Sequence, residues 1–598
     1  MCGISVVYRY SAVTEDDLSR VQRMNDQMRY RGPEDEGSWS DEHCAMGQVR
    51  LSIIGLENGR QPLFNHDKSL ALVCNGEIYN YVELKKELQA KGFSFLTDSD
   101  TEVILYLYEL YGTDCVNHLR GMFAFCLYDV KKQQLLAARD RIGEERIYYA
   151  EVPCGVVFCS ELKGILKAYI DTPQLNVSAL LEPIRFTGAL NPRDTFVEQI
   201  KRVQPGEVVV VNAHGVHRKF YWQRHRTYDF SGTVQEAKAE TLRLLREAVD
   251  IEMRSDVPVA IMLSGGVDSS AVAALAKQNG HEVHTITTGY TGKHYEDERE
   301  VARRFAKEQG FIYHEIELSE KDYVDCFDEL TSYLDEPMTD STAIAQWAMF
   351  KKVKELGFKV LLGGMGGDEL FYGYPAWNQL GDSLRLRREH ESIFPWKGKE
   401  RKLHWIRFVT QHLKWIMMAG YPNKLEDKSV AWWLHDDYYK FVKDATLTLG
   451  DETWRLDDYD IFKGFAPCPL GKEVDLVYDY AIDTVMTQAY LFLSDRLSMG
   501  NSLEVRSPLL DYKLFEHVMS LPLEYKYVSS RPKQYLKDVL AGIVPDYILY
   551  APKRGFSSPS EFVNHVAQQH EYKHFSSQHK FYNAVLADQL LTKLWDRP

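Results

Sequence analysis

The sequence predicts at least two domains, the second of which is an α/β domain built on an open parallel sheet. The chain has 598 residues, whereas single domains typically hold roughly 50 to 250. The stretch VPVAIMLSGGVDSS at 257–270 predicts a short buried strand, a tight glycine turn and the start of a helix. An amphipathic helix from Gln235 precedes this stretch, and strand-like and helix-like segments alternate after it, as is typical of parallel sheets.

Composition and charge narrow the class of protein. Hydrophobic residues make up 45% of the chain and charged residues 26%, which is typical of globular proteins with large cores. The net charge of −15 argues against nucleic-acid binding by the chain as a whole. No apolar run reaches the roughly 18 residues of a membrane span, and the N-terminus lacks a signal-peptide pattern. The nine cysteines show no metal-binding spacing. We therefore expect a cytoplasmic protein that binds neither nucleic acid nor membrane.

The glycine turn predicts an anion-binding loop. Gly265 and Gly266 let the backbone approach a ligand, and the helix that follows directs its amide N–H groups and the positive end of its dipole there. The polar residues 268–270 should cap that helix. An ordinary strand-to-helix turn is the alternative, but one glycine and one cap would suffice for it.

This loop resembles the S-G-G-x-D-S-[ST] loop of the ATP pyrophosphatase family, whose members split ATP into AMP and pyrophosphate while they adenylate a substrate. The resemblance implies ATP-binding residues in this loop and at two neighbouring strand ends. They are Leu263, Ser264, Gly265, Gly266, Asp268, Ser269, Ser270, Thr288 and Gly364. Ligands of open parallel sheets bind at the carboxyl ends of the strands, which is where we expect these residues to meet.

Cys2 is a candidate nucleophile. Removal of Met1 would leave an α-amine on the residue that carries the thiol, and an amine with a pKa near 8 can serve as the base for that thiol. The alternative is a cysteine buried in a strand, which is common.

Five further motifs favour the interpretation of Cys2 as a nucleophile over that of a buried strand cysteine. YRGP at 30–33, RLSI at 50–53, QP at 61–62, NGEIYN at 75–80 and SDTE at 99–102 resemble, in order and spacing, the class II glutamine amidotransferases. The resemblance implies an N-terminal-nucleophile fold of four αββα layers in residues 1–212, in which Cys2 attacks the glutamine side-chain amide.

The same resemblance implies roles for individual residues. Asn75 and Gly76 would stabilise the oxyanion, and glutamine would be held by Arg50, Asn75, Gly76, Glu77 and Asp100. A hairpin turn at Asn75-Gly76 is a second interpretation. One departure occurs at 144–146, where Glu-Glu-Arg replaces the usual lysine and proline, and we expect it to alter the interdomain surface and not the chemistry.

A second glycine-rich turn follows a third predicted strand. The sequence KVLLGGMGGDELFYGYP at 359–375 carries Asp368 and Glu369. Two carboxylates beside a polyphosphate are typical Mg²⁺ ligands, so Asp268 and Asp368 are the predicted metal ligands. A helix cap is the alternative role for Asp368 and Glu369.

The C-terminal motifs SDRLSMGNSLEVRSPLLD at 494–511 and APKRGF at 551–556 resemble the synthetase half of the glutamine-hydrolysing asparagine synthetases. The resemblance implies a synthetase domain at 235–598 with a helical C-terminal part, joined through a linker at 213–234. Lys553 would be catalytic and contact the acyl-adenylate, while Arg506 and Asp511 would fix helices behind the site. A surface lysine is the alternative for Lys553. The basic segment 384–413 predicts a solvated helix face, or else an acceptor lid or a surface for an acidic partner.

Together these resemblances predict a glutamine-dependent amidotransferase that uses ATP and Mg²⁺ to adenylate a carboxylate acceptor and then amidates it with ammonia. Aspartate is one acceptor. Two departures favour a different acceptor. Met365 stands where asparagine-forming relatives commonly have an acidic residue, and residues 340–350 lack the arginine that holds aspartate in some of them. A sugar acid or a natural-product acid is therefore the alternative acceptor. Glu369 or a substrate or phosphate oxygen would then accept the proton.

Three further points stay open. An intramolecular ligase and an inactive regulatory homologue are alternative functions, but Cys2 and Asn75 disfavour the first and the intact motifs disfavour the second. Ammonia needs an enclosed route between the sites, so we expect a large, partly apolar domain interface. The resemblance also leaves room for a homodimer.

Overall fold

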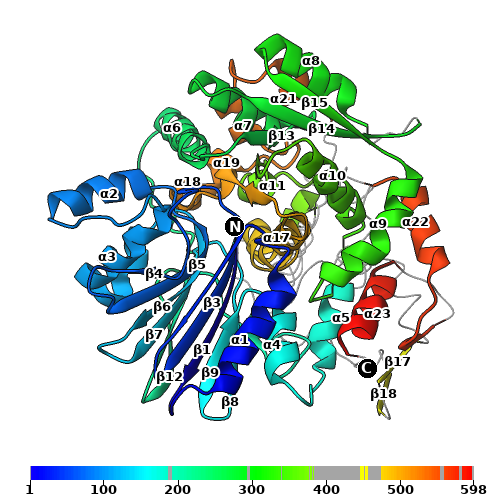
Figure 1. The fold of residues 1–598 in the computed structure, drawn as a ribbon. Coiled ribbons are helices and arrows are strands. Elements are labelled where there is room, and N and C mark those ends of the chain that lie inside the picture. The colour runs from blue at the N-terminus through cyan, green and yellow to red at the C-terminus, as the bar shows by residue number, and fades with distance from the viewer. Residues whose placement is uncertain are drawn as a thin grey trace, which may run out of the picture.

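The computed structural model describes most of the chain, and Figure 1 shows its arrangement. The described residues are 2–185, 191–292, 297–337, 340–375, 377–379, 381–382, 385, 445–449, 452–455, 473–552, 558–577 and 582–595. A β-rich N-terminal part packs against a second part built around a separate sheet (Figure 1). Lys553 and all but one residue of the basic segment 384–413 lie outside the described residues.

The N-terminal part contains two six-stranded antiparallel sheets. In spatial order the first consists of β10 (Lys201–Arg202), β8 (Tyr148–Val152), β9 (Gly155–Cys159), β1 (Cys2–Arg9), β3 (Cys44–Arg50) and β2 (Asp35–Ser40). The second consists of β12 (Gly215–Phe220), β11 (Glu207–Asn212), β7 (Gln134–Arg139), β6 (Met122–Asp129), β5 (Leu70–Glu77) and β4 (Leu63–Phe64).

Helices cover the outer face of each sheet. Helices α1 (Glu15–Met28) and α4 (Leu162–Tyr169) pack on the first sheet, and α2 (Tyr81–Ala90) and α3 (Val103–Tyr111) lie on the side of the second (Figure 1). Strand β1 is buried on both sides, because Val6 belongs to the core between the sheets and Val7 to the core under α1. The predicted αββα sandwich is confirmed.

The segment expected as a linker at 213–234 contains a strand. Residues of β12 pair with β11 from Asn212↔Gly215 to Glu207↔Phe220, so 215–220 extend the second sheet. Irregular backbone then runs to the N-cap of α6 (Val234–Glu252) at Thr233, where a capping box fixes the helix start.

The second part is an α/β domain on a five-stranded sheet whose strand pairs are all parallel. In spatial order the strands are β15 (Ile312–Leu318), β14 (His284–Tyr290), β13 (Val259–Met262), β16 (Val360–Leu362) and β19 (Glu504–Arg506). Its helices include α7 (Val267–Gln278), α8 (Arg299–Gln309), α9 (Glu320–Tyr333), α10 (Ala343–Glu355) and α11 (Gly367–Leu370). In β13, Ala260 faces the core that contains α9 and α10, and Ile261 faces the core that contains α7 and α8. The prediction of a parallel sheet is confirmed.

The C-terminal part is mainly helical, as predicted. Helix α16 (Glu473–Tyr480) continues through a π-helical stretch, η5 (Ala481–Tyr490), into α17 (Leu491–Gly500). The later helices are α18 (Tyr512–Ser520), α19 (Leu523–Lys526), α20 (Gln534–Val539), α21 (Asp546–Leu549), α22 (Ser560–Gln569) and α23 (Tyr582–Leu594). A small antiparallel sheet of β18 (Glu452–Arg455), β17 (Thr446–Leu449) and β20 (Phe575–Ser576) was not predicted.

The interface between the two parts combines apolar packing with buried ion pairs. Ile53 and Met122 of the N-terminal part join the apolar core around α6 and α7. The buried pairs that cross the interface include Arg31–Asp495 at 2.7 Å, Arg120–Asp511 at 2.6 Å and Arg202–Glu336. The expectation of a partly apolar interface holds, but composition gave no hint of these ion pairs.

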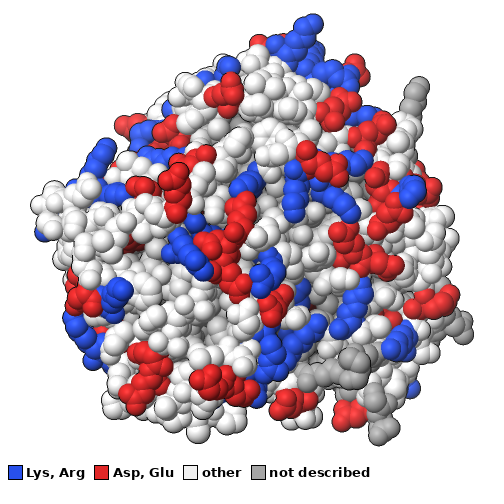
Figure 2. Space-filling model, viewed as in Figure 1, with Lys and Arg blue, Asp and Glu red and all other residues white. Residues whose placement is uncertain are grey.

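The exterior is polar and mixed in sign. On the face shown in Figure 2, Lys and Arg side chains are interspersed with Asp and Glu side chains. Within the described ranges, no helix has the length and apolar character needed to cross a membrane.

Candidate functional site

The first candidate site lies where the two N-terminal sheets meet at the start of β1. Cys2 stands opposite Arg50 of β3 in the first sheet. Its backbone N–H donates to Asn75 Oδ1 at 2.6 Å, and Asn75 belongs to β5 of the second sheet. Burial raises the pKa of the Cys2 thiol. Three residues that lie far apart in the sequence therefore converge here.

Gly76 follows Asn75 within β5, so these two residues do not form the hairpin turn considered above. Gly76 has φ +131°, and a Cβ built on it would lie 2.1 Å from the carbonyl oxygen of Met122. Only glycine fits this backbone position, because a side chain would clash with β6. The strand therefore carries the side chain of Asn75 and a bare backbone next to Cys2.

The other predicted glutamine-binding residues surround the same region. Arg50 donates through Nη2 to the carbonyl oxygens of Ile54 at 3.1 Å and Gly55 at 2.8 Å, which fixes its guanidinium against the loop. The Oδ2 atom of Asp100 accepts a hydrogen bond from the Ile78 N–H at 2.7 Å. Burial raises the pKa of Asp100 to about 6.

Glu77 connects this site to the second domain. Its Oε2 atom lies 3.8 Å from Nη2 of Arg506, which ends strand β19 of the parallel sheet. Burial raises the pKa of Glu77 well above its usual value. Arg506 was expected behind the nucleotide site, but the structure places its guanidinium against the first site, with Nη1 bonded to the carbonyl oxygens of Glu252 and Arg254.

Asp511 has two roles, one of which was expected. Its side chain caps α18 by accepting from the N–H groups of Lys513 and Leu514. The same carboxylate accepts from Arg120 of the N-terminal part at 2.6 Å and 3.0 Å.

Glu145 is a residue of the first site that the sequence analysis missed. Asn75 Nδ2 donates to Glu145 Oε2, and burial raises the pKa of Glu145 to about 8. Arg146 does lie on the interdomain surface, where it donates to the Thr487 carbonyl oxygen at 2.7 Å. The departure at 144–146 is therefore not confined to that surface, since Glu145 contacts a candidate catalytic residue.

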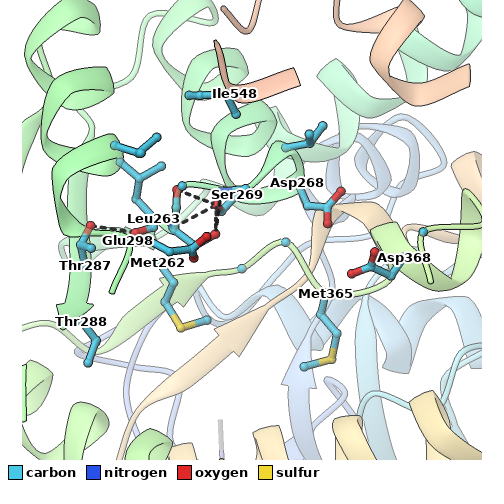
Figure 3. Close-up of a pocket in the computed structure, with 18 of the residues that line it drawn as sticks. Met262, Leu263, Asp268, Ser269, Thr287, Thr288, Glu298, Met365, Asp368 and Ile548 are labelled. Carbon is cyan, nitrogen blue, oxygen red and sulfur yellow. Dashed lines mark hydrogen bonds between the residues drawn. The ribbon is translucent and has the colours of Figure 1, made fainter. Parts of the chain in front are cut away.

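The second candidate site is a cavity of about 400 Å³ at the carboxyl ends of β13, β14 and β16. Figure 3 shows residues from these strand ends pointing into it. The predicted ATP-binding residues Leu263, Ser264, Gly265, Gly266, Asp268, Ser269, Thr288 and Gly364 all line this cavity. Ser270 does not, because it is fully buried in α7.

The glycine turn is closed by serine side chains and not by a helix cap. Helix α7 begins at Val267 with Gly266 at its N-cap, so residues 268–270 lie in the first turn instead of capping it. Ser269 Oγ accepts from the Ser264 N–H at 3.0 Å and bonds Ser264 Oγ at 2.9 Å (Figure 3). Across the strands, Thr287 donates to the Leu263 carbonyl oxygen at 2.7 Å. The Gly266 N–H also donates to Ser264 Oγ at 3.1 Å, so the loop is held in shape by its own polar groups.

Asp268 and Asp368 converge on one lysine. Lys533 Nζ lies 2.7 Å from Asp368 Oδ1 and also contacts Asp268 Oδ2. Burial opposes its charge, but the two carboxylates raise the pKa of Lys533. The sequence analysis assigned the functional cation to Lys553, which lies outside the described residues. Charge and spacing alone could not distinguish the two lysines.

Close backbone approach brings the two carboxylates together. A Cβ on Gly367 would lie 2.4 Å from Asp268 Oδ1, so the second turn needs glycine at that position. Asp368 and Glu369 lie in the first turn of α11 without a side-chain cap bond, so the capping alternative is not seen. Among the described residues, no cluster of three or more His, Cys, Asp or Glu could hold a metal. The paired oxygen donors of Asp268 and Asp368 nevertheless fit a Mg²⁺ ion that takes further oxygens from a polyphosphate.

Glu369 is buried beside the cavity but is not part of its lining. Its Oε1 atom accepts from the Tyr374 hydroxyl at 2.7 Å, and burial, followed by the charge of Asp368, raises its pKa to about 7. Met365 does line the cavity, between Met262 and Asp368 in the view of Figure 3.

Comparison with known proteins agrees with this two-site arrangement. The model of the glutamine amidotransferase domain matches residues 1–222, and that of asparagine synthase matches residues 240–598, which is more than half of the chain. The chain is 31% identical to asparagine synthetase [glutamine-hydrolyzing] 1 of Bacillus subtilis, over 95% of this chain and 90% of that one. It is 32% identical to asparagine synthetase [glutamine-hydrolyzing] 3 of the same organism, over 92% and 86%. It is also 28% identical to amidase chry2 of Gibberella zeae, over 94% and 89%. The chain therefore belongs to the asparagine synthase family, and it is a glutamine-dependent amidotransferase of that ligase type.

Proposed function

We propose that Cys2 releases ammonia from glutamine and that the second site uses this ammonia to amidate a carboxylate activated by ATP. Because burial raises the pKa of the Cys2 thiol, the thiol needs a base. The α-amine of Cys2 supplies that base once Met1 is removed. The 2.6 Å bond from the Cys2 nitrogen to Asn75 Oδ1 supports this role, because it holds the nitrogen in a fixed direction.

Glutamine binding follows from the charges around Cys2. Arg50 is positioned to hold the substrate carboxylate, and Asp100 and Glu77 its ammonium. Asn75 Nδ2 and the Gly76 N–H are the proposed oxyanion donors, which stabilise negative charge as the thiol adds to the amide carbon. The bare backbone at Gly76 supports this assignment, because it lets the substrate carbonyl approach closely.

ATP binds in the cavity of the parallel-sheet domain in this proposal. The Gly265 amide and the N-terminus of α7 would face the phosphates, while the Gly266 N–H donates to Ser264 Oγ at 3.1 Å and shapes the turn. Asp268 and Asp368 would hold Mg²⁺, which neutralises phosphate charge when bound. Lys533 supplies a positive charge to the same phosphates, and Lys553 is proposed to do so from a position that the structure does not describe.

Helix α17 supports the proposal that the two sites act in series. Within α17, Ser494 lines the cavity, and the next residue, Asp495, forms a 2.7 Å ion pair with Arg31. Arg31 in turn donates through Nε to the carbonyl oxygen of Cys2 at 2.8 Å. The nucleophile and the nucleotide cavity are therefore joined by neighbouring residues of a single rigid element.

The acceptor is aspartate or another carboxylic acid, and the cavity favours the second. The walls include Met365 of the second glycine turn and, away from both turns, Met349, Phe350, Tyr290 and Gln346. The described residues that line the cavity include no arginine, and their lysines are Lys533, which contacts both carboxylates, and Lys537 of α20. Among the described lining residues, charged groups that could contact an amino acid's head group are Glu298 and Lys537, whereas the apolar walls suit the body of a sugar acid or natural-product acid. The similar proteins include both asparagine synthetases and an amidase, so similarity to them does not identify the acceptor.

The proton released by attacking ammonia also needs an acceptor. The thioether of Met365 cannot take it at neutral pH. We propose Glu369, which is buried beside the cavity, or an oxygen of the substrate or phosphate. The 2.7 Å bond between Glu369 and Tyr374 supports the first choice.

A pyrophosphate-release assay tests the acceptor. With ATP, Mg²⁺ and ammonium chloride, we expect kcat/KM for at least one acid with an uncharged body to exceed that for aspartate by about tenfold or more, since an unpaired buried charge costs at least about 1.4 kcal/mol. Products are identified by mass spectrometry, and reactions without the acid provide the background. Efficient asparagine formation that no other acid outcompetes would contradict the expectation.

A further inference from the structure

The side-chain amide of Asn75 is held from both ends. Its Oδ1 atom accepts from the Cys2 N–H at 2.6 Å, and its Nδ2 atom donates to Glu145 Oε2. All three residues are buried, with exposed fractions of 6% for Cys2, 0% for Asn75 and 1% for Glu145. Water therefore does not compete strongly for these contacts.

The direction of this amide decides whether it can stabilise an oxyanion. Rotating an asparagine amide by half a turn exchanges its oxygen and its nitrogen with little change in shape. With Oδ1 toward Cys2, Nδ2 has two hydrogens, one of which Glu145 accepts, and the second is available to a negatively charged oxygen. In the reversed direction, Nδ2 would face the Cys2 N–H, donor against donor, and Oδ1 would stand where an N–H is needed for the oxyanion.

Glu145 is itself fixed by its backbone. Its N–H donates to Asp140 Oδ2 at 2.9 Å, and its carbonyl oxygen accepts from Arg139 Nε at 2.5 Å. Asp140 also accepts from the Gly143 N–H at 2.6 Å, which closes the turn that precedes Glu145. A rigid turn thus presents the carboxylate to Asn75.

We propose that Glu145 is a positioning residue, which orients the Asn75 amide so that its nitrogen faces the oxyanion formed at Cys2. The inference rests on the proposed glutaminase function and names one further residue that this function needs.

Three substitutions test the role. Glu145→Gln retains an acceptor oxygen in the same shape, whereas Glu145→Met and Glu145→Lys remove it. We expect the Met and Lys variants to lower the glutaminase kcat by about 10- to 100-fold, below the effect of deleting an oxyanion donor. Their KM for glutamine should change less than about threefold, and Glu145→Gln should retain most of the activity. Ammonia-dependent synthesis, which bypasses this site, should stay unchanged in all three and serves as the control for folding.

An aldehyde analogue separates positioning from general structural damage. Glutamate γ-semialdehyde adds to the Cys2 thiol, so that a carbon–sulfur bond forms, the proton moves to the former carbonyl oxygen, and that oxygen occupies the oxyanion position. In Glu145→Met its inhibition should weaken by the same factor as kcat, while inhibition by glutamate stays constant. In an Asn75→Ala background, Glu145→Met should have no further effect, because Glu145 acts through Asn75.

Several outcomes would overturn the role of Glu145. Equal activity of the Met and Gln variants, a rise in KM that matches the fall in kcat, or additive effects of the Glu145 and Asn75 substitutions would each do so. Glu145→Ala repeats the test if the Met variant does not fold. Failure of the wild-type enzyme to release glutamate from glutamine would instead refute the proposed function itself.

Discussion

Cys2→Ala is expected to reduce glutamine-dependent amidation by at least about 10⁴-fold and to leave ammonia-dependent amidation at its normal rate. The thiol is the proposed nucleophile, and loss of a catalytic nucleophile commonly costs this much or more. Added ammonia reaches the second site without it. Amide formation with glutamine and with ammonium chloride, together with glutamate release, measures both activities on one preparation.

Cys154→Ala is a suitable control, because Cys154 is an exposed cysteine of the same domain. It should leave both activities unchanged. Loss of ammonia-dependent activity in Cys2→Ala would contradict the division of labour between the two sites. Mass analysis of the active enzyme should also show that Met1 is removed, and retention of Met1 would exclude the α-amine as the base.

Asp268→Asn and Lys533→Met are expected to lower pyrophosphate release by about 10²- to 10³-fold and to preserve glutaminase activity. Both substitutions remove a charge from the point at which Asp268, Asp368 and Lys533 meet. Charges placed on a transferring phosphate contribute several kcal/mol, and each 1.4 kcal/mol corresponds to about tenfold in rate. Pyrophosphate and AMP are measured with the acceptor acid, and glutamate release is measured separately.

Asp250→Asn provides the matched carboxylate control, because Asp250 lies on the exposed side of α6 with half of its side chain accessible. It should change neither activity. Formation of ADP and phosphate in place of AMP and pyrophosphate would contradict adenylation. Equal loss of glutaminase activity in Asp268→Asn would show that the substitution damages the whole protein.

Local patterns predicted the strand, turn and helix of the parallel sheet, whereas the αββα fold and the roles of the site residues came from motifs that resemble known families. The strand, glycine turn and helix of 257–270 form as expected, and β1 places Cys2 next to Asn75. The details that failed depend on side-chain contacts that residue types and their spacing do not specify. Ser269 closes its loop through Ser264 instead of capping the helix, since a serine in the first turn can reach back to the strand end.

Long-range contacts also explain the residues that were missed. Lys533 approaches Asp268 across 265 positions of the chain, and sequence spacing contains no information about such a pair. Glu145 was predicted to lie on the interdomain surface with the rest of 144–146, whereas it is its neighbour Arg146 that contacts the second domain there. The turn that Asp140 closes directs Glu145 toward Asn75 and Arg146 toward the second domain. The directions of two adjacent side chains depend on the folded backbone and cannot be read from the sequence.

The ion pair between Arg31 and Asp495 has a consequence for the order of biosynthesis. These residues lie 464 positions apart, which corresponds to roughly 25 to 90 s of translation at about 5 to 20 residues per second. During that time the guanidinium can pair only with Glu161 of its own domain, which lies 3.2 Å away, so one of its two buried carboxylate partners is missing. Because Arg31 also holds the carbonyl oxygen of Cys2, the nascent N-terminal domain should fold with an imperfectly held nucleophile. Glutamine would then be spared from idle hydrolysis until the domain that consumes ammonia has been made.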